Sequence, residues 1–245
     1  MTKLSVNLNK IALIRNSRDS DFPRLLDFAE ICIDAGAHGL TIHPRPDQRH
    51  ARYSDVPDLV RLATRHPGVE VNIEGYPNEK FLEVVIAAAP DQCTLVPDDP
   101  DQLTSDHGWD TLRHGDSLSR IIEQLHEHNI RTSIFLDPEV SMLESALATG
   151  TDRIELYTES YARAFGTNAE DDVWIQFDRV ARAAQDMGLG VNAGHDLNQD
   201  NLPRFLQIPG ILEVSIGHAL TVESLKSGFS STVADYLELI NITAQ

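Results

Sequence analysis

Cysteine is scarce in this sequence. Only Cys32 and Cys93 occur, and each lies inside an apolar segment. Cysteines in such surroundings behave as small core side chains, and their low number favours a reducing compartment over a secreted, disulfide-stabilised protein. We therefore expect neither a disulfide nor a redox centre.

Long hydrophobic runs are also missing. No window approaches the roughly 20 apolar residues that a membrane-spanning helix requires. The N-terminal segment, residues 1–18, has no apolar stretch long enough for a signal peptide. We expect a cytoplasmic protein with no membrane partner.

Basic residues are few. Against 38 Asp and Glu there are 20 Lys and Arg, so the formal net charge is −18. Such a field repels polyanions, and nucleic acid is not an expected partner. A small phosphorylated ligand would have to be held locally, by a few arginines, backbone N–H groups and helix N-termini.

The remaining composition is that of a globular α/β protein. Hydrophobic residues make up 41% and charged residues 24% of 245 residues, which suits one large domain spanning residues 1–245. Short, mostly apolar β-rich segments alternate about eight times with amphipathic stretches, a pattern typical of a parallel sheet with crossover helices. The predicted strands contain LSVN, GLTIH, VEVNIEG, DQCTLVP, IRTSIFLD, DRIELY, LGVNAGH and LEVSIGH.

This alternation predicts a (β/α)8 TIM barrel. The alternative, an open doubly wound sheet, normally has a glycine-rich turn after its first strand. Here the first strand is followed by NLNKIALIRNSR, which contains no glycine. The closed barrel is therefore favoured, and its chemistry is expected at the C-terminal ends of the strands.

Polar and titratable residues follow almost every predicted strand, and in a barrel they would converge on one rim. Their convergence is stronger evidence for a site than any single residue. The residues at these positions are Asn7, Asn9, Lys10, His43, Arg45, Glu74, Thr104, Glu155, His195, Gly217 and His218.

The segment HPRPDQRH after the second strand combines two prolines with positive charge. Each proline restricts the backbone, so the segment can hold His43 and Arg45 at a set separation. Arginine is the natural bidentate partner of a phosphate. The alternative is a turn with solvated charges. The positive cluster consists of Arg45, Arg49, His50 and Arg52.

Glu74 and His195 are candidates for proton transfer. Burial at a strand end would raise the pKa of the Glu74 carboxyl toward a useful range, although a carboxylate that only pairs with an arginine is the alternative. The segments AGHDLN and IGHALT lie after the seventh and eighth strands, where barrels commonly bind phosphate. Arg18, in the loop after the first strand, is a candidate for a second anionic group.

A metal site is not expected. His43, His50, Glu74, His195 and His218 are possible ligand types, but the sequence has neither H-x-H on the first strand nor H-E-x-x-H. A metal-dependent hydrolase is therefore a minor alternative.

The motifs together resemble those of the pyridoxine 5'-phosphate synthase family over nearly the whole chain. The resemblance implies a barrel with additional helices, no cofactor, a homo-octamer, and condensation of 3-amino-2-oxopropyl phosphate with 1-deoxy-D-xylulose 5-phosphate to pyridoxine 5'-phosphate, phosphate and water. The motifs are VNLNKIALIRNSR, GLTIHPRPDQRH, VNIEG, LVPDD with LTSDHGWD, RIELYT, VNAGHDLN and VSIGHA.

Roles for individual residues follow from the same resemblance. His43 and Glu74 would accept protons and His195 would donate one. The amino ketone phosphate would be held by Asn7, Arg18, Asp196, Gly217 and His218, and the deoxyxylulose phosphate by Asn9, Lys10, Arg45, His50 and Thr104.

Three positions depart from the common family pattern. Asn9-Lys10 replaces Asp-His, and Asp196 replaces glycine. We expect the Asp196 side chain to turn away from the phosphate and cap the following helix. Two other functions remain open, an aldolase or epimerase with Lys10 as Schiff-base lysine, and a phosphate-binding barrel without catalysis.

Overall fold

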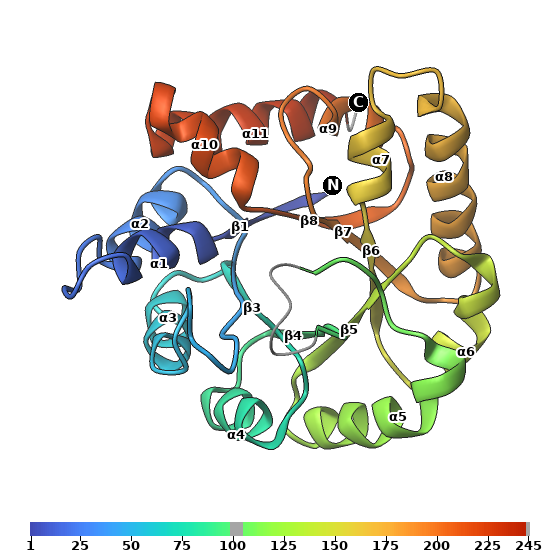
Figure 1. Cartoon of the computed structure of the whole chain (residues 1–245), viewed down its shortest axis with the longest axis horizontal. Coiled ribbons are helices and arrows are strands. Elements are labelled where there is room, and N and C mark those ends of the chain that lie inside the picture. Colours follow the sequence, from blue (N-terminus) through green and yellow to red (C-terminus); the bar gives the residue numbers. More distant parts are fainter. Residues whose placement is uncertain (99–104, 244–245) are drawn as a thin grey trace.

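A closed barrel of eight parallel strands forms the centre of the molecule, which confirms the predicted TIM-barrel class (Figure 1). The computed structural model describes residues 1–98 and 105–243. The strands follow one another around the barrel in chain order. They are β1 (Lys3–Asn7), β2 (Gly39–Ile42), β3 (Glu70–Gly75), β4 (Gln92–Leu95), β5 (Arg131–Leu136), β6 (Arg153–Tyr157), β7 (Gly190–Gly194) and β8 (Ile211–Ile216).

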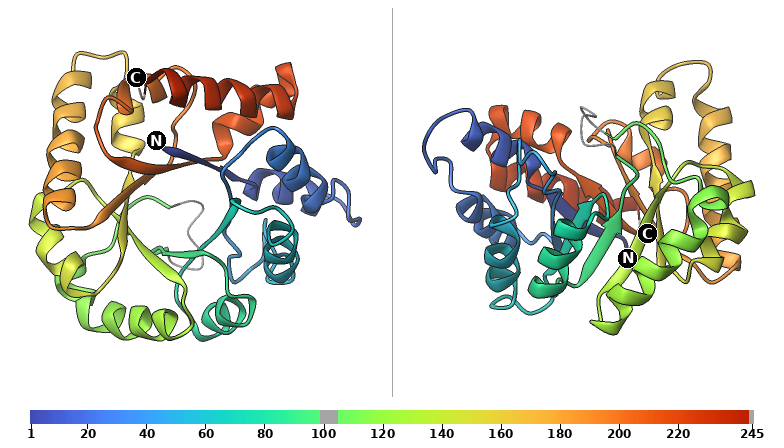
Figure 2. Two further views of the ribbon diagram at one scale, coloured as in Figure 1. Left: turned by 180° about the vertical axis from the view of Figure 1, so that it is seen from behind. Right: turned by 60° about the horizontal axis from the view of Figure 1, so that its bottom comes forward.

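Helices surround the strands on the outside, as the two views in Figure 2 show. After β1, β6 and β8 the chain forms two successive α-helices, and after β5 a 3-10 helix precedes an α-helix. None of the helices in the described part of the chain is long and apolar enough to cross a membrane. The helices are α1 (Asn9–Asn16), α2 (Leu25–Asp34), α3 (Asp55–Ala63), α4 (Glu79–Ala88), α5 (Thr111–Glu127), η1 (Val140–Met142), α6 (Leu143–Ala148), α7 (Glu159–Ala164), α8 (Glu170–Asp186), α9 (Leu202–Phe205), α10 (His218–Ser227) and α11 (Phe229–Thr243).

The main hydrophobic core lies between the strands and this helical layer. Alternate strand residues such as Leu40, Ile42 and Ile73 are fully buried there. Helix α4 illustrates how a helix is positioned against the barrel. The Asn78 side chain caps it by accepting a hydrogen bond from the Phe81 N–H at 2.9 Å. The Phe81 ring then fills the space beside Gly75, where a Cβ atom would lie 2.2 Å from it. Any larger residue at position 75 would displace α4.

The inside of the barrel is mainly polar. Many barrels fill this space with branched aliphatic side chains. Here the hydroxyls of Ser5 and Thr41 are hydrogen-bonded at 2.7 Å, and the Thr94 hydroxyl donates to Asn72 at 3.0 Å. The strands, which the sequence predicted as mostly apolar, are thus apolar on their outward face and polar on their inward face. The polar residues of the middle of the barrel are Ser5, Thr41, Asn72, Thr94, Ser133, Glu155, Asn192 and Ser215.

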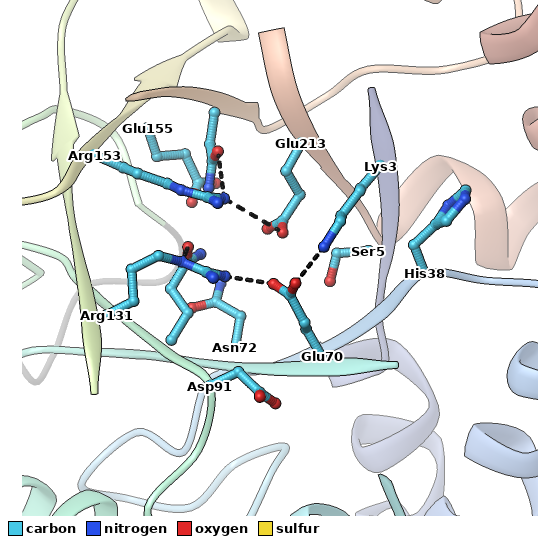
Figure 3. A network of polar contacts seen from close by, with 12 residues as sticks. Lys3, Ser5, His38, Glu70, Asn72, Asp91, Arg131, Arg153, Glu155 and Glu213 are labelled. Atoms are coloured by element: carbon cyan, nitrogen blue, oxygen red, sulfur yellow. Dashed lines mark hydrogen bonds and ion pairs between the residues drawn. The ribbon is translucent and has the colours of Figure 1, made fainter. Parts of the chain in front are cut away.

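Ion pairs close the base of the barrel, at the N-terminal ends of the strands (Figure 3). Glu70 binds both Lys3 and Arg131. Arg153 donates a hydrogen bond to Asn192 at 3.2 Å and lies 4.0 Å from the carboxylate of Glu213. These charges join β1, β3, β5, β6 and β8 across the barrel.

Candidate active site

A cavity of about 490 Å³ opens at the mouth of the barrel, at the C-terminal ends of the strands. It brings together most of the residues that the sequence predicted for the site. The predicted residues in its wall are Asn7, Asn9, Lys10, His43, Arg45, His50, Glu74, His195, Asp196, Gly217 and His218.

Two predicted residues are not in this wall. Arg18 is exposed on the loop between α1 and α2, and Thr104 lies outside the described residues. The arginine that this part of the chain buries is Arg15, whose guanidinium binds both carboxylate oxygens of Asp55 at 2.8 and 2.9 Å. Arg15 therefore ties α1 to the start of α3.

Asparagines from the end of β1 organise one side of the cavity. Asn9 and Lys10 form the first turn of α1. The Asn7 side-chain oxygen accepts from the Asn9 N–H at 3.0 Å, and the Asn9 side-chain oxygen accepts from the His43 N–H at 2.8 Å. The Asn7 amide also donates to Glu74 at 3.3 Å. The amides thus connect His43 to Glu74 through β1.

Positive charge gathers on the β2 side of the cavity. Burial and the nearby Arg45 guanidinium lower the pKa of His43 well below its usual value, and the same causes lower the pKa of His50 to about 4. The two rings meet edge to face, with centroids 5.9 Å apart. Both histidines are therefore neutral at pH 7 and able to accept a proton. Lys10 and Arg49 complete this basic wall.

Arg45 also forms a buried ion pair with Asp98. The Ser105 hydroxyl donates to the same Asp98 carboxylate at 2.7 Å, and Tyr157 donates to the Ser105 carbonyl at 3.2 Å. Asp98 and Ser105 thereby connect the basic wall to β6.

Two carboxyl groups complete the polar lining of the cavity: Glu74, half-buried on β3 next to β2, and Glu155, buried on β6. Burial raises the pKa of Glu74 to about 7, and the negative charges of Asp98 and Glu213 act in the same direction. Burial and the neighbouring Glu74 raise the pKa of Glu155 well above its usual value. Ser215 donates to Glu74 and Thr94 to Glu155, each at 3.4 Å. A carboxyl group with a pKa near 7 is suited to exchange protons at physiological pH.

His195 is held by an unusual backbone at the end of β7. Its φ is 91° and that of Asp196 is 60°. A non-glycine residue at such φ is uncommon and marks local strain when it is bulky. The Thr158 hydroxyl bonds to the carbonyls of Gly194 and His195, and the Tyr157 ring packs edge-on against the imidazole at 4.9 Å.

Asp196 does not cap the next helix, so that expectation is wrong. Asn201 precedes α9, and the Asp196 carboxylate instead lies 3.1 Å from Nδ1 of His195. This close contact with His195 lowers the pKa of Asp196. Asp196 is therefore an ionised partner of His195.

Gly217 and His218 form the part of the cavity wall that follows β8, next to β1. Gly217 precedes α10, which begins at His218. A Cβ atom at Gly217 would lie 2.9 Å from the Asn7 side chain, so glycine allows β8 and β1 to approach closely here. The N-terminus of α10 lies in the cavity wall and offers backbone N–H groups to an anion.

Some wall residues were predicted without a role or not predicted. Glu155 was among the strand-end residues of the sequence but had no assigned role. Ser215 was not predicted, although the two-residue alternation of the strands places it on the same inward face. Val96 and Phe135 form a small apolar cluster with Tyr157, which is separate from the main core. Within residues 1–98 and 105–243, no group of three or more His, Cys, Asp and Glu side chains is arranged to bind a metal.

The sequence matches known proteins over nearly its whole length. The family described as "Pyridoxal phosphate biosynthesis protein PdxJ" matches residues 4–242. A pyridoxine 5'-phosphate synthase of Albidiferax ferrireducens is 48% identical, covering 98% of this chain and 97% of the relative. One of Flavobacterium johnsoniae is also 48% identical, covering 97% and 99%.

Solved structures show the same barrel at low identity. KGPDC from Streptococcus mutans aligns with a TM-score of 0.65 at 12% identity over 100% of both chains. A putative fructose-1,6-biphosphate aldolase from Coccidioides immitis aligns with a TM-score of 0.65 at 12% identity, covering 99% of this chain and 90% of the other. These similarities concern the fold alone.

Proposed function

Since the chain belongs to the pyridoxal phosphate biosynthesis protein PdxJ family and catalyses pyridoxine 5'-phosphate synthesis, we propose that the cavity at the barrel mouth is its active site. In this proposal His43 and Glu74 accept protons and His195 donates one. The reaction joins 3-amino-2-oxopropyl phosphate to 1-deoxy-D-xylulose 5-phosphate and releases phosphate and two molecules of water.

The single observation that carries this assignment is that His43, Glu74 and His195 line one cavity in different electrostatic surroundings. His43 is buried beside Arg45, which keeps the imidazole neutral and able to take up a proton. Glu74, with a pKa of about 7, can both take up and return a proton in the same pH range. Condensation of an amine with a ketone, dehydration and ring closure require such repeated transfers. His195 has a carboxylate beside it, which suits a proton donor.

The two phosphate groups would bind at two separate places in the cavity wall. We assign the deoxyxylulose phosphate to the basic wall, where Lys10, Arg45 and His50 lie with Asn9. Thr104 belongs to this group by resemblance.

The amino ketone phosphate would bind at the start of α10. There Gly217, His218 and the backbone of Asp196 lie close to Asn7 in the cavity wall. Arg18, which is exposed in this structure, would have to move inward to join them. An anion at this place would interact favourably with the N-terminal end of the helix.

The test is turnover of both substrates by purified protein, with His43→Asn and His195→Asn variants alongside. We expect pyridoxine 5'-phosphate and free phosphate from the wild type, and a loss on the order of 10²- to 10⁴-fold in each variant. Binding of each substrate, followed by calorimetry, should persist. Variants that retain full turnover would contradict the assigned roles.

We further propose that the chain works as a cytoplasmic homo-oligomer, an octamer by resemblance to the family. Exposed apolar side chains on neighbouring helices support association: Leu13 and Ile14 on α1, and Val222 and Leu225 on α10. Sedimentation velocity tests this directly. A single 27.2 kDa species at micromolar concentration would contradict it.

A further inference from the structure

The carboxylate of Asp196 contacts the proposed proton donor from the neighbouring position in the chain. Its Oδ2 atom lies 3.1 Å from Nδ1 of His195. The His195 side chain is 21% exposed and that of Asp196 is 45% exposed, and both line the cavity. The contact therefore lies at the active site and not on the outer surface.

The backbone makes this contact possible. In a strand, successive side chains point to opposite faces, so residues 195 and 196 would not meet if β7 continued. The positive φ angles of both residues turn the chain instead. Aspartate tolerates this left-handed region better than most residues do. Thr158 fixes the turn through the carbonyls of Gly194 and His195.

We propose that Asp196 is a positioning residue that fixes the ring of His195, holding a proton on Nδ1 so that Nε2 presents its proton to the substrate. This inference rests on the proposed role of His195 as donor. A carboxylate on one ring nitrogen sets the tautomer and stabilises the imidazolium form, because the opposite charge favours the protonated ring. The catalytic residue is His195, and Asp196 acts through it.

Other charged groups around the pair keep Asp196 ionised. The pKa of Asp196 is lowered first by the direct contact with His195, and then by the charges of His195, His218 on α10 and Arg163 on α7. From β6, Tyr157 packs on the imidazole, and the Glu155 carboxyl lies over Gly194, where a Cβ atom would be 2.3 Å from its oxygen. Asp196 is thus a carboxylate over the pH range in which the reaction would be measured.

The side chain and the backbone of residue 196 would have separate tasks. Glycine at this position would supply the same backbone N–H to a phosphate, but it would supply no carboxylate. The aspartate therefore adds a partner for His195 without removing the phosphate donor. This difference gives the experiment its two variants, Asp196→Asn and Asp196→Gly.

The experiment compares these variants with the wild type by kcat as a function of pH. We expect kcat to fall on the order of tenfold, which is part of the 10²- to 10⁴-fold that a general acid contributes. The KM values should change little, and the basic limb of the kcat profile should move to lower pH. Asp106→Asn is the matched control, because Asp106 also contacts the next histidine in the chain, His107, but neither lines the cavity.

A second measurement is independent of turnover. Nitrogen-15 NMR of the histidine rings should show the His195 proton held on Nδ1 in the wild type and exchanged between both ring nitrogens in Asp196→Asn. Glycine adopts a φ of 60° without steric strain, so Asp196→Gly should keep the fold. An unchanged tautomer together with an unchanged pH profile would overturn the role of Asp196.

The same data separate this inference from the proposed function. If His195→Asn retains full turnover, the donor role of His195 fails, and with it the catalytic consequence of Asp196. If His195→Asn is inactive but Asp196→Asn matches the wild type in rate, profile and tautomer, the donor role stands and the positioning role of Asp196 is wrong.

Discussion

Strand β3 carries a glutamate at each end of its inward face, and the barrel gives the two opposite properties. At the base, hydrogen bonds and charge from Lys3 and Arg131 outweigh burial and lower the pKa of Glu70. At the mouth, burial and the charges of Asp98 and Glu213 raise the pKa of Glu74 to about 7. The strand and the residue type are the same, so the surroundings alone determine the difference.

The distribution of cations explains this contrast. Three cations, Lys3, Arg131 and Arg153, face the carboxylates of the base (Figure 3). At the mouth, Arg45 is paired with Asp98, while Glu74 and Glu155 repel each other across the cavity. The base therefore holds fixed charges that tie strands together, whereas the mouth holds carboxyl groups that can gain or lose protons.

Replacing Glu74, the glutamate at the mouth of the barrel, should have the largest effect on catalysis. We expect Glu74→Gln to reduce kcat on the order of 10²- to 10⁴-fold, or about 3–5 kcal/mol of transition-state stabilisation, because an amide cannot accept the proton. Urea unfolding above pH 7 should show stability equal to or greater than that of the wild type, because a buried carboxylate has been removed. A variant that is both inactive and unfolded would contradict the prediction that Glu74 serves catalysis and not stability.

Removing an ion pair at the base of the barrel should instead lower the free energy of unfolding. Arg153→Met leaves the Glu213 carboxyl, whose side chain is 4% exposed, without its guanidinium partner. The expected loss in the free energy of unfolding is about 3 kcal/mol. Urea denaturation at pH 8 measures it, and substrate binding by the folded variant should persist. A loss of turnover at full stability would show that the base takes part in catalysis.

Glu70, at the base of the same strand, provides the matched control for Glu74 at the mouth. Glu70→Gln removes a carboxylate whose side chain is 22% exposed, so solvent screens part of the effect and the loss should be about 1 kcal/mol. Since its folded pKa is lowered, this stabilisation is present above the unfolded pKa and is lost as the pH falls through the folded value. The stability difference from the wild type should therefore shrink in acid, and kcat should not change.

Local sequence patterns were sufficient to predict the barrel and most of the cavity wall. Each predicted strand overlaps an observed one, because the apolar pattern of a strand and the residues that end it are local features of the sequence. The polar interior was not predicted, since its partners, such as Asn7 and Glu74, lie 67 residues apart. Only the closed barrel brings them together.

Two features near the cavity could not be predicted, for similar reasons. The side-chain direction of Asp196 depends on two positive φ angles, which the motif VNAGHD does not specify. Arg15 and Arg18 belong to one segment, and only the packing of α1 against Asp55 determines which is buried. Composition identifies these residues as polar, but their surroundings decide what they bind.

The smallest expected effect links the two ends of the barrel. As a proton acceptor Glu74 must be ionised, so kcat should rise with pH through about 7. Its raised pKa also means that the folded state binds more protons than the unfolded state below that pH, so this group makes stability fall as the pH rises.

Glu213 contacts Arg153 at the base, yet its charge raises the pKa of Glu74. Glu213→Gln should therefore move the acidic limb of the kcat profile to lower pH, while Glu70→Gln should leave it in place. If neither variant moves the limb, burial and Asp98 alone set the acidity of Glu74, and the two ends of the barrel are electrostatically independent.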